Sequence, residues 1–418
     1  MNTLPIAVAV ALGAGVPLAC AQSGNLKPPQ AQAWIDVATY SGMGMPGMGA
    51  PGMNPMQALG GLFGGGGAAK NSFGHTVDGA TGRWVDVTLM TRANPSLTEA
   101  TQAVPSGFMS PALKLQAPPS AKPAPRDDGD EVVEHDVERP RGRLLLYWGC
   151  GATVRAGQPK VLDMASASAG DIAKFFVSRR ATQRGAHSAS GRPVWPSPAD
   201  ARMLPEQASL VGEHAFSGAG VPEGFRFAIP SAQDLMPPLQ LQQADQGGAT
   251  ELRWAALPTA RAYFVAGMGA AKQDEMVIWT SSELPDTGFG LLDYQPNASI
   301  DRWVKEKVLL PAGATGCTVP KGVLPAEGGM LRAIAYGSEL NLAHPPRPAD
   351  PKAPWEPVWA AKLRVKSVAS LMLGMPGGMS GMGQTAPAQE PGGQAGEEAK
   401  KEEKKPKPLD LLRGILGR

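Results

Sequence analysis

Methionines gathered in two glycine-rich stretches are the residues whose type and spacing most clearly fit metal chemistry. Residues 41–67 read SGMGMPGMGAPGMNPMQALGGLFGGGG, and residues 372–396 read MLGMPGGMSGMGQTAPAQEPGGQAG. Thioethers are soft ligands that select Cu(I), and a flexible chain could wrap them around one ion. Such repeats are also typical of plain linkers or weak hydrophobic contacts, which is the competing interpretation. The candidate ligands are Met43, Met45, Met48, Met53, Met56, Met375, Met379 and Met382.

The first cysteine lies in a segment that is typical of protein export. Residues 6–19 form an apolar run too short to span a membrane, and Ala19-Cys20-Ala21 follows it. A small residue on each side of a cleavage position is the pattern of a secretory signal peptide, which predicts removal of residues 1–21. A second interpretation treats Leu18-Ala19-Cys20 as a lipobox, with Cys20 lipidated and retained. Both interpretations predict an exported protein, soluble in the first case and an outer-membrane lipoprotein in the second.

Two further cysteines, Cys150 and Cys317, remain after such cleavage. In the oxidising periplasm or extracellular space they are candidates for a disulfide. The alternative is that both are small buried hydrophobic residues, since geometry rather than number decides whether two cysteines pair.

Signatures of catalysis are missing from the sequence. The five histidines are too scattered for a local zinc motif, and Ser188 and Ser190 lack the glycine pattern of a hydrolase nucleophile. The glycine run 61–67 is not followed by the Lys-Ser/Thr pair of a phosphate-binding loop. We therefore expect a non-enzymatic protein without a cofactor, Cu(I) being the alternative.

The C-terminal residues 409–418 form a candidate partner-binding segment. At helical spacing, one face carries Leu409, Leu412, Ile415 and Leu416. Ten residues are too few for a stable isolated helix, so this segment would fold against a protein groove or a membrane surface. The alternative is a frayed apolar end without a partner.

The composition separates folded regions from linkers. Glycine and proline supply 52 and 41 of the 418 residues, and the net charge of +2 offers no broad basic surface for nucleic acid. We expect a linker at residues 22–69, a β-rich domain at 70–240 with a disordered acidic and proline-rich insertion at 102–140, a second domain at 241–370, and a disordered tail at 371–408.

Short apolar or alternating runs predict that both domains are mostly β. Residues 144–149 are continuously apolar, which favours a central strand buried on both faces. One helix is expected at residues 168–180. Further strands are expected at residues 83–90, 160–164, 210–216 and 225–229. Many short strands separated by turn residues favour two β-sandwich-like domains.

Within the second domain, the segment of about residues 241–345 resembles a fibronectin type III domain. Trp254 would be its core tryptophan, facing strand F across the sandwich. The segment 284–314 is longer than in that family and includes a helical turn at 300–308. The segments that carry the resemblance are Glu251–Trp254 and Ala262–Val265, which look like strands B and C, and Cys317–Val323 and Leu331–Gly337, which look like strands E and F. The resemblance implies a binding or spacer module.

Tyr147–Gly151 and Met276–Ser282 also make the chain resemble a family of exported proteobacterial proteins of unknown function, which implies no activity. Together these features predict an exported, non-enzymatic binding or structural protein of the bacterial cell envelope, with a protein or envelope partner. The alternative is a periplasmic Cu(I)-binding protein that uses the methionine-rich stretches.

Overall fold

The fold is mostly β, as the sequence predicts. The computed structural model describes residues 27–42, 71–77, 79–119, 142–177, 179, 185–272, 274–350 and 353–374.

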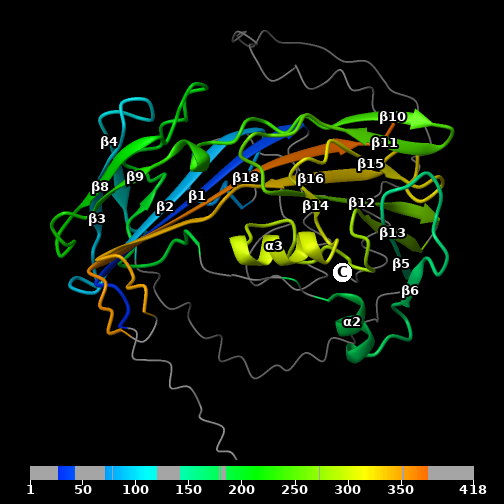
Figure 1. Ribbon diagram of the computed structural model, residues 1–418, viewed down its shortest axis with the longest axis horizontal. Coiled ribbons are helices and arrows are strands. Elements are labelled where there is room, and N and C mark those ends of the chain that lie inside the picture. The colour runs from blue at the N-terminus through cyan, green and yellow to red at the C-terminus, as the bar shows by residue number, and fades with distance from the viewer. Residues whose placement is uncertain are drawn as a thin grey trace, which may run out of the picture.

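One large sheet of fifteen strands organises the described residues, in the order β6-β5-β13-β12-β16-β18-β1-β2-β7-β4-β3-β8-β9, with β14 paired to β12 and β17 paired to β18 (Figure 1). Its strands are β1 (Ala31–Gly42), β2 (Gly82–Thr91), β3 (Glu99–Ala103), β4 (Ala112–Gln116), β5 (Arg143–Trp148), β6 (Lys160–Asp163), β7 (Val194–Trp195), β8 (Gly212–Ser217), β9 (Arg226–Ile229), β12 (Ala262–Lys272), β13 (Glu275–Thr280), β14 (Leu310–Pro311), β16 (Met330–Tyr336), β17 (Leu340–His344) and β18 (Trp359–Met372).

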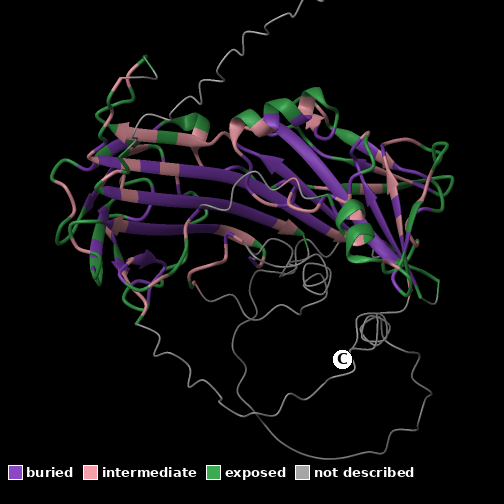
Figure 2. Cartoon of the chain, turned by 90° about the horizontal axis from the view of Figure 1, so that it is seen from below, coloured by how far each residue is buried: buried purple, intermediate pink, exposed green. Residues whose placement is uncertain are grey.

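The centre of this sheet joins the two ends of the described chain. Strand β1 runs parallel to β18, from Ala31 opposite Trp359 to Gly42 opposite Ser370, and antiparallel to β2 on its other side. These long strands are buried along most of their length (Figure 2). The prediction of a linker at residues 22–69 is therefore wrong for the residues of β1, because both faces of this strand are covered. Strand β18 likewise extends two residues into the tail expected from 371.

A second, three-stranded sheet packs on one face of the large one. It consists of β10 (Gln242–Gln246), β11 (Ala249–Arg253) and β15 (Gly316–Val319), with β11 in the middle. Leu252 of β11 and Val319 of β15 belong to the same apolar cluster as Val265 of β12 and Ala333 of β16. This cluster also takes in Ala33, Ile35 and Val37 of β1 and is the main core of the protein.

Two helices border the opposite face. Helix α3 (Asn297–Lys305) buries Ile300 and Trp303 against the sheet. Helix α2 (Ala169–Phe175) begins at Ser168, whose hydroxyl accepts a hydrogen bond from the Asp171 amide (3.2 Å), while the Asp171 carboxylate accepts one from the Ser168 amide (3.0 Å). This capping box fixes the start of the helix. The helix ends earlier than the expected residue 180. A short 3₁₀ turn, η1, covers Ser231–Gln233.

The strand predictions near residues 83–90, 160–164, 210–216 and 225–229 are confirmed by β2, β6, β8 and β9. Strand β5 is confirmed too, but it lies next to the edge strand β6, and its residues Leu145 and Tyr147 are only half-buried. The expectation that both faces of this strand are buried is therefore wrong.

The expected boundaries also need correction. The insertion at residues 102–140 contains strand β4 and the end of β3, so its first part belongs to the sheet. Strands from both sides of residue 240 are neighbours: β5 pairs with β13, and β2 and β18 flank β1. One sheet thus runs through both expected domains.

Candidate functional site

A buried group of charged and aromatic side chains occupies the helix-covered face of the central strands. We call it the polar seam and define it as Asp36, Tyr40, Asp86, Asp293, Tyr294, Arg332, Arg364 and Lys366. Six of these residues come from the adjacent strands β16, β18, β1 and β2, where successive side chains alternate between the two faces. The charged residues therefore share their face with Ala38, Trp84 and Val368, which pack beneath α3.

The pair Asp36–Arg364 lies at the centre of the seam. The two residues are directly opposite across the parallel β1–β18 pair. The Arg364 guanidinium donates two hydrogen bonds to the Asp36 carboxylate, at 2.6 and 2.5 Å, and both side chains are more than nine-tenths buried. Burial by itself lowers the pKa of Arg364, but the charge and hydrogen bonds of Asp36, together with the charge of Asp293, outweigh this effect and raise the pKa above its ordinary value. Asp36 and Arg364 thus form an ion pair buried within the core.

The backbone of residues 185–186 packs directly against this ion pair. The amide of Ala186 donates a hydrogen bond to the Asp36 carboxylate at 2.8 Å. A Cβ atom added to Gly185 would lie 1.6 Å from an Arg364 guanidinium nitrogen and 2.6 Å from an Asp36 oxygen. Only glycine therefore fits at this position.

Asp86 lies directly opposite Asp36 on β2. Its carboxylate accepts hydrogen bonds from the amides of Gly74 (2.9 Å) and Thr76 (3.0 Å) and from the Thr76 hydroxyl. Burial raises the pKa of Asp86 to about 6, because these hydrogen bonds offset only part of the cost of desolvating the charged form. Asp86 is thus a buried acid that titrates near neutral pH.

Lys366 is a fully buried lysine two residues along β18. Its ammonium lies 3.2 Å from the Asp293 carboxylate and 4.2 Å from the centre of the Tyr294 ring. The guanidinium of Arg364 lies 4.3 Å from the same ring. Burial opposes ionisation of Asp293, but Lys366 and Arg364 together lower its pKa below the ordinary value. The loop that carries residues 293 and 294 therefore supplies both charge and an aromatic face to two buried cations.

Arg332 is the third cation of the seam. It lies on β16 opposite Ser370 of β18, and its guanidinium is 5.9 Å from the centre of the Tyr40 ring. The side chain is 2% exposed, and within the described part of the chain none of its three guanidinium nitrogens has a hydrogen-bond partner. The other two cations each have a carboxylate, so Arg332 is the uncompensated charge of the group.

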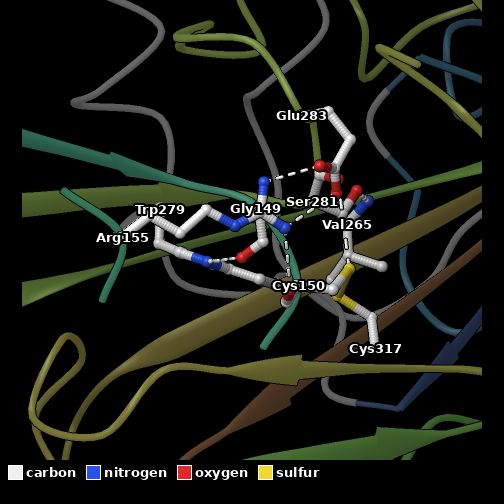
Figure 3. The surroundings of a disulfide bond; sticks show 8 residues. All are labelled: Gly149, Cys150, Arg155, Val265, Trp279, Ser281, Glu283 and Cys317. Atoms are coloured by element: carbon white, nitrogen blue, oxygen red, sulfur yellow. Dashed lines mark hydrogen bonds and ion pairs between the residues drawn. A yellow bond between two sulfur atoms is a disulfide. The ribbon is translucent and has the colours of Figure 1, made fainter. Parts of the chain in front are cut away.

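A disulfide links the large sheet to the small one, on the face of the large sheet opposite the polar seam (Figure 3). Cys150, just after β5, is bonded to Cys317 of β15, with 5.2 Å between their Cα atoms. The pairing that the sequence leaves open is thus formed. Around it, Gly149 donates an amide hydrogen bond to Thr280, and Gly151 donates one to Thr318, both at 2.9 Å.

Arg155 closes the disulfide loop from outside. Figure 3 shows its guanidinium between the Cys150 backbone and the carboxylate of Glu283. It donates to the Cys150 carbonyl at 3.0 Å and to Glu283 at 2.5 and 3.0 Å. Gly149 has a φ of +90°, and a Cβ there would lie 2.7 Å from this guanidinium. The turn after β5 is therefore shaped to hold Cys150 against the small sheet.

The other predicted site residues lie outside the described residues. They are the eight candidate copper ligands, Met43, Met45, Met48, Met53, Met56, Met375, Met379 and Met382; the lipidation candidate Cys20; and the partner-binding residues Leu409, Leu412, Ile415 and Leu416.

Within the described ranges, no three His, Cys, Asp or Glu side chains come together to hold a metal ion. No helix in this part of the chain is both long and apolar enough to cross a membrane. No protein-family model matches the sequence, and no curated protein matches it significantly.

Proposed function

We propose that this chain is an exported, non-enzymatic binding or structural protein of the bacterial cell envelope. The observation that carries the proposal is the Cys150–Cys317 disulfide. Stable structural disulfides are formed in the periplasm and outside the cell, whereas the cytosol keeps thiols reduced. The signal-like residues 1–21 point to the same compartment independently.

The arrangement of the sheets supports a structural or binding role. The disulfide ties the turn after β5 to the small sheet across 167 residues of chain. Cross-linking so long a loop removes much of the conformational freedom of the unfolded chain. The seam adds a buried ion pair between the first and last strands. A rigid scaffold of this kind suits a protein that presents surfaces outside the cell.

We also propose that residues 241–345 form a fibronectin type III-like unit within the larger sheet. That family places strands B and E in one sheet and C and F in the other. Strand β11 pairs with β15, and β12 pairs with β16, in two different sheets. Trp254 is buried in the main core, with its ring centre 5.5 Å from that of Tyr263. These pairings support the assignment of the four segments as B, C, E and F.

Fractionation of the native bacterium tests the export proposal. We expect the protein in the periplasmic, outer-membrane or culture fraction, and a variant lacking residues 2–21 in the cytoplasm. The mass of the mature N-terminus separates the two export routes: a start at Gln22 indicates cleavage, and a lipid-modified Cys20 indicates a lipoprotein, which the Cys20→Ala variant would abolish. Full-length protein confined to the cytoplasm would overturn the proposal.

A further inference from the structure

The polar seam contains one positive charge more than its ion pairs neutralise. Arg364 is paired with Asp36, and Lys366 with Asp293. Arg332 has no hydrogen-bond partner among the described residues, although it is 2% exposed. Asp86 does not compensate it, because Asp86 lies three strands away on β2 and its oxygens accept hydrogen bonds from Gly74 and Thr76.

A buried guanidinium without a hydrogen-bond partner needs an acceptor. Arginine stays protonated in proteins, so Arg332 cannot escape the cost of burial by losing its charge. The ring of Tyr40, at 5.9 Å, attracts the cation but accepts none of its five N–H groups. Buried charges of this kind are as a rule paired with an opposite charge, and an unpaired one marks a place where a partner is missing.

Apart from Tyr40, the neighbours of Arg332 are short or apolar. Ala266 lies opposite it on β12 and Ser370 opposite it on β18, and next to Ser370 in the same row lies Gly42 of β1. The nearby Met268 and Met330 belong to the apolar cluster beneath α2, and Ile334 belongs to the cluster beneath α3. Apart from the Tyr40 ring, the described neighbours of the Arg332 guanidinium are therefore small or apolar.

We propose that Arg332 binds the carboxylate group of a small monoanionic ligand. The two oxygens of a carboxylate match the parallel N–H groups of a guanidinium. One negative charge neutralises the single uncompensated cation, whereas a phosphate dianion would leave an excess negative charge in the core. The apolar surroundings favour a ligand whose remainder is small and uncharged, such as a short aliphatic or aromatic acid. This inference goes beyond the proposed export and does not depend on it.

Thermal unfolding of the purified protein tests the proposal. Sodium acetate and sodium benzoate are compared with sodium chloride at equal ionic strength, and sodium phosphate serves as a further probe. A ligand that binds only the folded state raises the unfolding midpoint in proportion to the logarithm of its concentration above Kd. We expect this rise for at least one carboxylate in the wild type and its loss in Arg332→Met. The matched control Arg253→Met, whose side chain is 67% exposed, should respond as the wild type does.

The same series contains the results that would overturn the proposal. Equal midpoints in carboxylate and chloride would show that the wild type binds no such anion, and an equal carboxylate response in Arg332→Met would place the binding elsewhere. A rise with phosphate alone would exclude the carboxylate assignment. Should Arg332→Met fail to fold, Arg332→Lys keeps the charge but loses the fork, and we expect at least a tenfold weaker carboxylate response from it. An undiminished response in that variant would contradict the proposal.

Discussion

Replacement of Asp36 by alanine should destabilise the protein more than any surface charge substitution. The change leaves the Arg364 guanidinium buried without its carboxylate, and removing one partner of a buried ion pair costs about 3–5 kcal/mol. Asp293 and the Tyr294 ring still face Arg364, so the lower part of that range applies. The Ala186 amide also loses its acceptor, which adds about 1 kcal/mol. We therefore expect a total loss of about 4 kcal/mol.

Urea unfolding of the oxidised protein measures this loss, with the m-value checked for constancy. The control is Glu356→Ala, which breaks the exposed pair of Lys27 and Glu356 (66% and 63% exposed) and should cost less than about 1 kcal/mol. A double-mutant cycle with Arg364→Met isolates the interaction, and the double variant should recover much of the loss because no unpaired charge remains. A cost for Asp36→Ala equal to that of Glu356→Ala, or a coupling energy near zero, would refute the central role of this pair.

The buried carboxyl of Asp86, the tight packing at Gly185 and the methionine-rich stretches can each be tested separately. The pKa of Asp86 is about 6 in the folded state against the ordinary value of 3.8, so the folded state binds this proton more tightly than the unfolded state does. The contribution of Asp86 to the free energy of unfolding is therefore most favourable below about pH 4. About 3 kcal/mol of that contribution is lost as the pH rises through 6. Asp86→Asn should remove this part of the pH dependence in urea unfolding from pH 4 to 8, and an unchanged profile would be inconsistent with a raised pKa. Gly185→Ala should destabilise the protein by several kcal/mol because its Cβ has no room beside Arg364, whereas Gly313→Ala, where a Cβ meets nothing within 4 Å, should be tolerated in the same measurement. Protein purified from copper-supplemented cells should contain no stoichiometric copper by metal analysis. Copper that is present in the wild type but absent from a variant without the first methionine group would support the Cu(I) alternative instead. The residues replaced in that variant are Met43, Met45, Met48, Met53 and Met56.

The sequence predicts the β-rich class and several strands because alternation and β-branched residues report directly on a half-buried strand. Strand β1 is missed because Ala31–Gly42 is buried on both faces and carries Asp36, so it shows neither alternation nor an uninterrupted apolar run. Its stability comes from pairing with β18, more than 300 residues away in sequence, as the Asp36–Arg364 separation of 328 shows. No local pattern reports such a contact.

The polar seam is missed for a related reason. In Lys362-Leu363-Arg364-Val365-Lys366, charged and apolar residues alternate, which ordinarily indicates one face in water. Here both faces of β18 are covered, and Arg364 and Lys366 lie on the face that packs beneath α3. Only the three-dimensional arrangement of Asp36 and Asp293 shows what neutralises them. Cys150 and Cys317, by contrast, are recognisable as candidates for a disulfide, because the signal-like segment predicts an oxidising compartment and two cysteines remain after cleavage. Whether they pair depends on the distance between β5 and β15, which the sequence does not show.

The proposed export requires that the Cys150–Cys317 disulfide is present in the protein inside its native cells. Intact cells that produce the protein can be quenched with acid, their free thiols alkylated, and the protein digested without reduction and analysed by mass spectrometry. We predict that the peptides containing Cys150 and Cys317 are recovered cross-linked to each other, with little alkylation of either residue. Recovery of both cysteines in the alkylated form would contradict the proposed export and the covalent link between the two sheets.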